Sequence, residues 1–370
     1  MITIDDVRDK LMSLDEARER LARTEPMKTF PFTVGDDIHF AATGDWHHGA
    51  ESRQPSELVG VYLEHRSNGL GHQFQLTHGA VQEACAAFGL RKEYVNDCSP
   101  ELLIPHMNYW FRGGLLSKPR KGTGFQFVID ENDSAVAFTK RGHAPFSNLQ
   151  LLDIAAQRIR ETFSASDEVL VDFKFTHTLR KTRFRLIIPA LQAVIAPGDV
   201  WSLGLQVNNS LTGTSQTSAE GYLFRYLCTN GAIDMRAKSG AVTRSKDATS
   251  DEVTEWARQA VDEALAGLEG AFDAVRRLTD IGIDGSTGDT LRDVFEHYRI
   301  PIPLRPKVIQ ALEEYDGEIT MYAIMNAITQ VANEAGLDDG SVNTLLRVGG
   351  EFPYTAEKRC GACHRLYHQH

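Results

Sequence analysis

The sequence predicts an α+β fold, with a central antiparallel sheet of β-hairpins flanked by helices and a mainly helical C-terminal region. The strand signal lies between Val169 and Cys228, where apolar residues recur at every second position. The helical signal begins at Ser250, after which apolar residues recur every three or four positions. Hydrophobic residues make up 42% and charged residues 24% of the 370, which excludes a disordered, collagen-like or coiled-coil chain.

The elements expected along the chain divide it into four regions. Residues 1–26 form an exposed N-terminal helical arm with sparse apolar contacts. Residues 27–248 form an α+β core, with short aromatic-rich strands up to Leu76 and then two helices opened by Thr77 and Ser99. Residues 249–350 form an acidic helical region whose first helix runs unbroken over 250–278, and residues 351–370 form a tail.

Two hairpins are expected at the centre of the core. Residues 169–175 should pair with 184–188, and residues 201–207 with 222–228. In the second hairpin one face is apolar, and the other carries small or polar, uncharged residues such as Gln206 and Asn208. We expect Arg225 to lie on this polar face, where its guanidinium can bind phosphate through two parallel hydrogen bonds.

Charge is unevenly distributed along the chain. The net charge is -11, but residues 102–246 hold 18 Lys and Arg against 11 Asp and Glu, so this part carries +7 and the remainder -18. A basic centre between acidic flanks favours a polyanionic partner, and it favours pairing between copies of the chain as a homo-oligomer. Five cysteines without a regular framework, an acidic N-terminus and no long apolar run predict a cytoplasmic protein without a membrane partner.

Two stretches without a carboxylate, residues 102–129 and 173–198, predict nucleic-acid binding. Their cations match phosphates, and interleaved aromatic residues offer faces on which bases stack. In the alternative interpretation the aromatic residues belong to the core and the cations to a solvated edge. Together with Arg225, the expected binding residues are Arg112, Lys118, Arg120, Lys121, Lys174, Arg180, Lys181, Arg183 and Arg185.

Two segments of the sequence are candidates for metal binding. The triplet from Asp172 to Lys174 matches the carboxylate-x-lysine arrangement of metal-dependent nucleases, and Asp130 and Asp153 are candidates to complete it. The tail holds a candidate half of a zinc site, or else it is simply a free tail. Its candidate ligands are Cys360, Cys363 and His364. Standard nucleotide-binding and hydrolase motifs are absent, so we predict no catalytic residue and expect a protein that is not an enzyme.

Several separated strings, at residues 76–111, 137–154, 207–233, 319–336 and 345–352, together resemble a phage- and plasmid-borne family known as domain of unknown function 932. The most specific of them is the turn with Asn209, Ser210 and Gly213, followed by an element that runs from Arg225 to Asn230 and Gly231. We expect Asn209 and Asn230 to brace turns, because asparagine hydrogen-bonds its own backbone. The resemblance implies a setting of prophages and mobile plasmids, among recombination and single-strand-binding genes, but no particular activity.

The sequence therefore predicts a phage or mobile-element protein that binds nucleic acid, in particular single-stranded DNA, during recombination or replication. Two alternatives stay open. In one, the acidic flanks bind a protein, as in a virion or counter-defence interaction factor. In the other, the triplet around Asp172 belongs to a metal-dependent nuclease.

Overall fold

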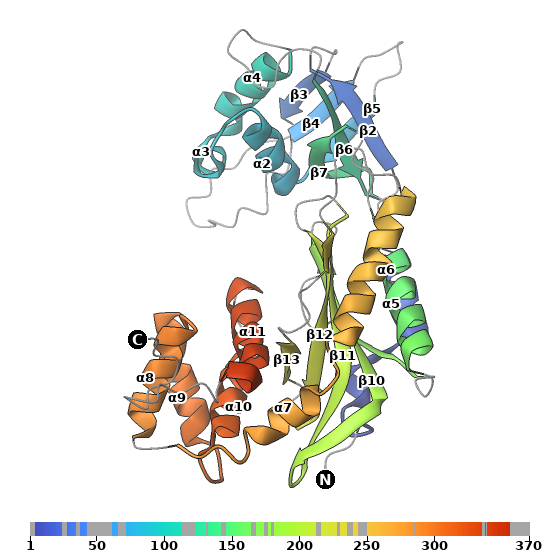
Figure 1. Cartoon of the computed structure of the whole chain (residues 1–370). Coiled ribbons are helices and arrows are strands. Elements are labelled where there is room, and N and C mark those ends of the chain that lie inside the picture. The colour runs from blue at the N-terminus through green and yellow to red at the C-terminus, as the bar shows by residue number, and fades with distance from the viewer. Residues whose placement is uncertain are drawn as a thin grey trace.

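A computed structural model describes the fold of most of the chain. It shows an α+β protein with two separate β-sheets and their helices, which confirms the predicted fold class (Figure 1). The residues it describes are 4–23, 28–34, 38–42, 61–65, 72–112, 123–130, 132–141, 146–163, 168–173, 177–178, 181–211, 216–227, 230–234, 240–242, 250–283, 286–334, 337 and 339–355.

The smaller sheet and its helices lie at one end of the molecule (Figure 1). Its strand order is β2-β6-β7-β5-β4-β3, with β5 and β7 parallel and the other neighbours antiparallel. Phe32, Phe111, Phe125 and Phe138 meet in its core. The elements are β2 (Lys28–Thr33), β3 (Ile38–Ala42), β4 (Val61–His65), β5 (His72–Leu76), α2 (His78–Ala87), α3 (Lys92–Asp97), α4 (Pro100–Phe111), β6 (Gly124–Ile129) and β7 (Ser134–Lys140).

The larger sheet is antiparallel throughout, with strand order β1-β8-β10-β11-β12-β13 and with β9 and β14 added to β10 and β12. The predicted pairings of β8 with β10 and of β11 with β12 are present, but residues 201–207 lie opposite 219–225 and not opposite 222–228. The elements of this part are η1 (Arg8–Lys10), β1 (Met12–Ser13), α1 (Leu14–Ala22), α5 (Asn148–Thr162), β8 (Leu170–Asp172), β9 (His177–Thr178), β10 (Lys181–Ala196), β11 (Asp199–Asn209), β12 (Thr217–Arg225), β13 (Asn230–Asp234) and β14 (Gly240–Val242).

The C-terminal helices share one hydrophobic core with the larger sheet and with α1 and α5. The expected boundary at residue 248 is therefore not a boundary between cores. None of the helices in the described part of the chain is long and apolar enough to cross a membrane. The elements are α6 (Ser250–Ala266), α7 (Ala271–Arg277), α8 (Thr287–His297), η2 (Ile302–Leu304), α9 (Arg305–Glu313), α10 (Met321–Val331) and α11 (Asp339–Thr355).

The helix expected over residues 250–278 is interrupted. It forms α6 and α7, separated by residues 267–270. Gly270 has φ 71°, a left-handed conformation that glycine adopts at little cost and that an α-helix does not contain. The amphipathic pattern continues across the break, which is why the spacing of apolar residues alone predicts a single helix.

The prediction of an exposed N-terminal arm is wrong. The helix starts only at Leu14, where Ser13 and Glu16 form a reciprocal capping box, and its apolar side lies in the main core. Strand β1 adds to the edge of the larger sheet beside β8, and Arg18 donates to Asp153 of α5 at 2.8 Å. The sequence does not predict this packing, because large apolar residues are sparse in the helix. Small residues such as Ala17 also pack against the core.

We therefore expect Leu21→Ala to destabilise the protein by about 2–5 kcal/mol, because Leu21 is fully buried and its loss leaves a cavity. Chemical denaturation of the full chain measures this change. Leu102→Ala is the matched control, since Leu102 is 61% exposed and its truncation removes little packing. Equal stability of the two variants would contradict the core position of this helix and favour a peripheral arm.

Candidate nucleic-acid interface

Most cations of the predicted basic hairpin that the structure describes are buried. Asp172, Arg185, Gln206 and Glu220 lie directly opposite one another on four neighbouring strands, and we call this set the polar row. Arg185 donates to Asp172 at 3.5 Å and to Gln206 at 3.3 Å, and Gln206 donates to Glu220 at 3.2 Å. Arg347 of α11 completes the row by donating to Glu220. Positive and negative charges alternate, so the row is neutral within the protein.

Arg183 lies on the same face, two residues from Arg185 along β10. It is 4% exposed, and its Nε donates to Asn208 Oδ1 at 2.9 Å, while Asn208 donates to Ser218 at 3.1 Å. Arg185 also stacks over the ring of Tyr222, 4.4 Å from its centre. Neither guanidinium is at the surface, so the hypothesis that these two arginines bind a nucleic-acid backbone is wrong for this conformation.

Arg225 lies on the opposite face from the one expected. It pairs with Trp201 across the strands, whereas Gln206 and Asn208 point to the other face. Its guanidinium forms a hydrogen-bonded ion pair with the Asp199 carboxylate. Nε lies 2.9 Å from both carboxylate oxygens, and Nη2 lies 2.6 Å from Oδ2. The pairing register, which the sequence does not specify, decides the face. Arg225 is therefore a buried structural cation.

Tyr322 of α10 joins this pair to the C-terminal helices. Burial, reinforced by the negative charge of Asp199, raises the pKa of Tyr322 well above its usual value, so the hydroxyl stays protonated. It donates to Asp199 Oδ2 at 2.6 Å and accepts from Trp201 Nε1 at 2.8 Å. The carboxylate thus receives hydrogen bonds from a strand and from a helix at once.

The motif behind the family resemblance is structural where it is described. Asn209 donates to Phe146 O at 2.7 Å and to Asn148 Oδ1 at 2.8 Å, and it accepts from Thr217 at 2.7 Å. Asn209 therefore has a structural role, but two of its three bonds reach residues far away in the chain and not its own turn. Ser210 is fully buried. At Gly231 an added Cβ would lie 2.1 Å from a backbone oxygen of β12, so another residue does not fit there. Asn230 begins β13.

Of the remaining predicted cations, Lys181 is half-buried and Arg112 is exposed. Nη2 of Arg112 lies 3.4 Å from His39 Nδ1. The other candidates lie outside the described residues. These are Lys118, Arg120, Lys121, Lys174, Arg180, Gly213, Cys360, Cys363 and His364.

The three carboxylates that the nuclease hypothesis requires do not form one site. Asp172 belongs to the polar row, Asp153 accepts from Arg18, and Asp130 accepts from two backbone N–H groups in the turn between β6 and β7. Within the described ranges, no group of three or more His, Cys, Asp or Glu side chains is placed to hold a metal ion. The site that the triplet suggested is thus not assembled from these three carboxylates.

Aromatic side chains do gather on the surface of the smaller sheet's helices. We call Tyr94, His106, Tyr109 and Trp110 the α3–α4 aromatic surface. Tyr94 and Tyr109 are 40% and 50% exposed, His106 is exposed and Trp110 is half-buried. The Tyr94 hydroxyl lies 3.0 Å from His106 Nδ1. Ring centres are 6.3 Å apart from Tyr94 to His106 and 5.4 Å apart from His106 to Trp110, so three rings form a continuous row.

A second feature lies between the N-terminal segment and the larger sheet, where a pocket of about 480 Å³ is lined by Lys10, Arg20, Asp172, Phe173 and Phe224 among others. The Arg20 guanidinium lies over the Phe173 ring, 4.9 Å from its centre. Asp172 in the wall of this pocket is paired with Arg185, and the Phe173 and Phe224 rings are buried, so neither ring offers a face on which a base can stack. The α3–α4 aromatic surface is therefore the better candidate for a nucleic-acid interface.

The sequence pointed to this surface only in part. The carboxylate-free stretch contains Tyr109, Trp110 and Arg112, but Tyr94 and His106 carried no signal of their own. Helical spacing is a signal for His106, because residues 102, 106 and 109 lie on one face of α4, but it does not indicate Tyr94, which belongs to α3.

Comparison with protein-family models gives no match for this chain, and comparisons with curated proteins and with solved structures give none. The resemblance to domain of unknown function 932 therefore stays a prediction from the sequence, and the geometry of the site itself is what bears on function.

We expect Arg225→Ala to cost about 3–5 kcal/mol, because it leaves the Asp199 carboxylate buried without its counter-charge. The melting temperature should fall by more than about 5 °C in a thermal scan. Arg258→Ala is the control, since its ion pair with Glu255 is exposed and its loss should leave stability nearly unchanged. A near-normal melting temperature for Arg225→Ala would contradict the structural role.

Proposed function

We propose that this protein binds single-stranded nucleic acid, in particular single-stranded DNA, and that bases stack on the α3–α4 aromatic surface. The observation that carries the proposal is the row of rings that runs from the exposed Tyr94 and His106 to the half-buried Trp110. Stacking on aromatic side chains is worth about 1–3 kcal/mol per base and tolerates any sequence, because every base has a flat face.

The charge next to these rings supports the same function. The chain from Leu102 to Ile129 carries Arg112, Lys118, Arg120 and Lys121 and no carboxylate, and it begins within α4 itself. Cations so close in sequence to the rings are suited to binding the phosphates between stacked bases. Helix α3 contributes the exposed acids Glu93 and Asp97, so the cations that bind phosphates must come from Arg112 and the segment that follows α4.

The interface in this proposal differs from the hairpin that the sequence suggested. The hairpin's described arginines pair with carboxylates and donate hydrogen bonds to amides inside the larger sheet, whereas Tyr94, His106 and Tyr109 face solvent. We retain, as part of the proposal, a non-enzymatic phage or mobile-element protein that acts in the cytoplasm during recombination or replication. The nuclease alternative gains no support from the arrangement of its carboxylates.

The double variant Tyr94→Ala/Tyr109→Ala should bind a fluorescent thirty-nucleotide oligothymidine at least tenfold more weakly than the wild type, because two stacking faces are removed. Fluorescence anisotropy at about 50 mM salt measures this affinity. Both rings are largely exposed, so the fold should tolerate their truncation. Leu227→Ala, which truncates an exposed apolar residue in the turn after β12, is the matched control and should bind normally.

The salt dependence identifies the cations in the same assay. Replacing Arg112, Lys118, Arg120 and Lys121 with alanine should flatten the log–log slope by about 0.7 for each phosphate that the protein no longer neutralises. If instead the variant Arg180→Ala/Lys181→Ala abolished binding while the double tyrosine variant and the four-cation variant kept it, the interface would lie on the hairpin. Absence of any binding by the wild type would end the proposal.

We also propose that the chain forms a homo-oligomer, because its +7 centre and -18 remainder attract between copies. Light scattering after size exclusion should show a larger species at about 50 mM salt and a shift toward the monomer at about 500 mM, where charges are screened. A monomer at micromolar concentration in both buffers would refute this part.

A further inference from the structure

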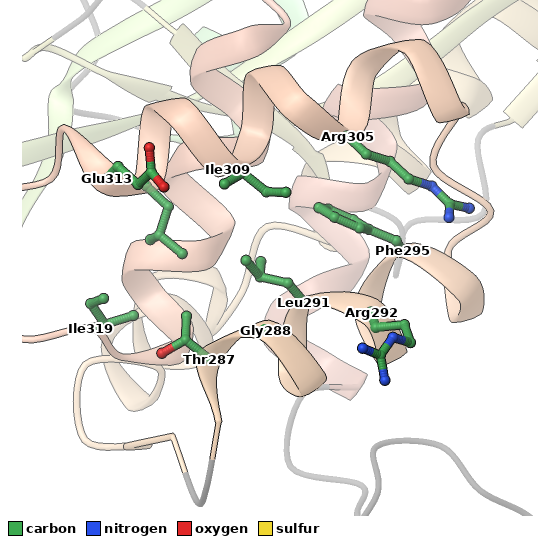
Figure 2. Close-up of a pocket in the computed structure, with 10 residues that line it drawn as sticks. Thr287, Gly288, Leu291, Arg292, Phe295, Arg305, Ile309, Glu313 and Ile319 are labelled. Atoms are coloured by element: carbon green, nitrogen blue, oxygen red, sulfur yellow. The ribbon is translucent and has the colours of Figure 1, made fainter.

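Helices α8 and α9 enclose an apolar groove that the proposed function does not use. They run antiparallel, and Thr287, Leu291 and Phe295 of α8 face Ile309 of α9 across it (Figure 2). The groove has a volume of about 500 Å³. Its lining residues recur every fourth position on α8, so it extends over about two helical turns, or roughly 12 Å.

The apolar side chains of this groove are partly open to solvent. Leu291, Phe295 and Leu312 are buried and form its floor, whereas Ile309 on its wall is 38% exposed. An exposed apolar wall above a buried apolar floor gives an apolar occupant contacts on two sides.

The two ends of the groove differ in charge. Arg292 and Arg305 stand at the end near Phe295, and Glu313 stands at the opposite end (Figure 2). Arg305 is fixed there, because its Nε donates to Ile300 O at 3.0 Å and its guanidinium lies over the Phe295 ring. Arg292 is held by Asp289 at 3.0 Å in an exposed ion pair. An occupant with carboxylates at one end therefore matches the arginine end.

We propose that this groove binds an amphipathic α-helix of a partner protein. The helix would insert apolar side chains spaced at i, i+4 and i+7 between α8 and α9, and it would place carboxylates beside Arg292 and Arg305. This is the geometry of helix-in-groove recognition, in which a third helix packs against two others. The proposal does not depend on nucleic-acid binding, which we assign to a different part of the fold.

Two other occupants fit less well. A small molecule would stay exposed along the open side of the groove, whereas sites for small ligands bury most of the ligand's surface. The chain's own last residues, 356–370, carry Lys358, Arg359 and Arg365 against the single acid Glu357, so their charge does not match the arginine end. A helix from another protein, with acids at one end, matches both the shape and the charge.

The test uses two synthetic fluorescein-labelled peptides of fifteen residues, built on the same alanine-rich helix with leucines at i, i+4 and i+7. One carries three glutamates at one end, and the other carries lysines in their place. Anisotropy with the full-length protein should show the acidic peptide binding at least fivefold more tightly. Ile309→Lys should weaken its binding at least tenfold, and Arg292→Glu should reverse the preference between the two peptides.

Leu227→Lys is the matched control, because it places the same charge on an exposed apolar residue in the turn after β12, and it should bind the acidic peptide normally. Unchanged circular dichroism and melting temperature show that each variant is folded. Failure of the acidic peptide to bind, or binding that Ile309→Lys leaves unchanged, would overturn the proposal. Binding of decanoate in the groove without binding of the peptide would also overturn it, since the groove would then be a small-molecule site.

Discussion

The ion pair between Asp199 and Arg225 fixes the relation between the larger sheet and the helices that follow it. Both side chains are buried, so each needs the other to offset the cost of leaving water. Tyr322 binds the same carboxylate from α10, and Trp201 binds Tyr322, so sheet and helix share one hydrogen-bond network. Removing any member leaves a buried polar group unsatisfied. For this reason the sheet and the C-terminal helices form one structural unit.

The same principle explains why a basic stretch of sequence does not form a basic surface. In the polar row, Asp172, Arg185, Glu220 and Arg347 alternate in sign, so the charges cancel where they are buried. Asn208 and Gln206 supply the remaining hydrogen-bond partners. A count of charges along the chain treats every arginine as available to a ligand. Only the exposed cations contribute to the field that a polyanion meets.

The two proposed ligand-binding surfaces belong to different parts of the fold. The α3–α4 aromatic surface lies on the smaller sheet's helices, and the apolar groove lies between α8 and α9 at the other end of the molecule (Figure 1). Under these proposals one part of the chain binds nucleic acid and the other recruits a helical segment of a partner. Such an arrangement brings a partner protein to single-stranded DNA. It also includes protein binding, the alternative function that the acidic flanks of the sequence suggested.

The sequence by itself determined the fold class, the hairpin pairings and most helices, because periodicity of two or of three to four residues reflects which side chains face the core. It also indicated a structural role for Asn209, but not its distant partners Phe146 and Asn148. Only the tertiary structure decided that Arg183, Arg185 and Arg225 are internal, that α1 belongs to the core and that Tyr94 meets His106. These outcomes depend on strand register and on contacts between residues far apart in the chain. Asp199 and Tyr322, for example, are separated by more than a hundred residues, and local patterns do not encode such contacts.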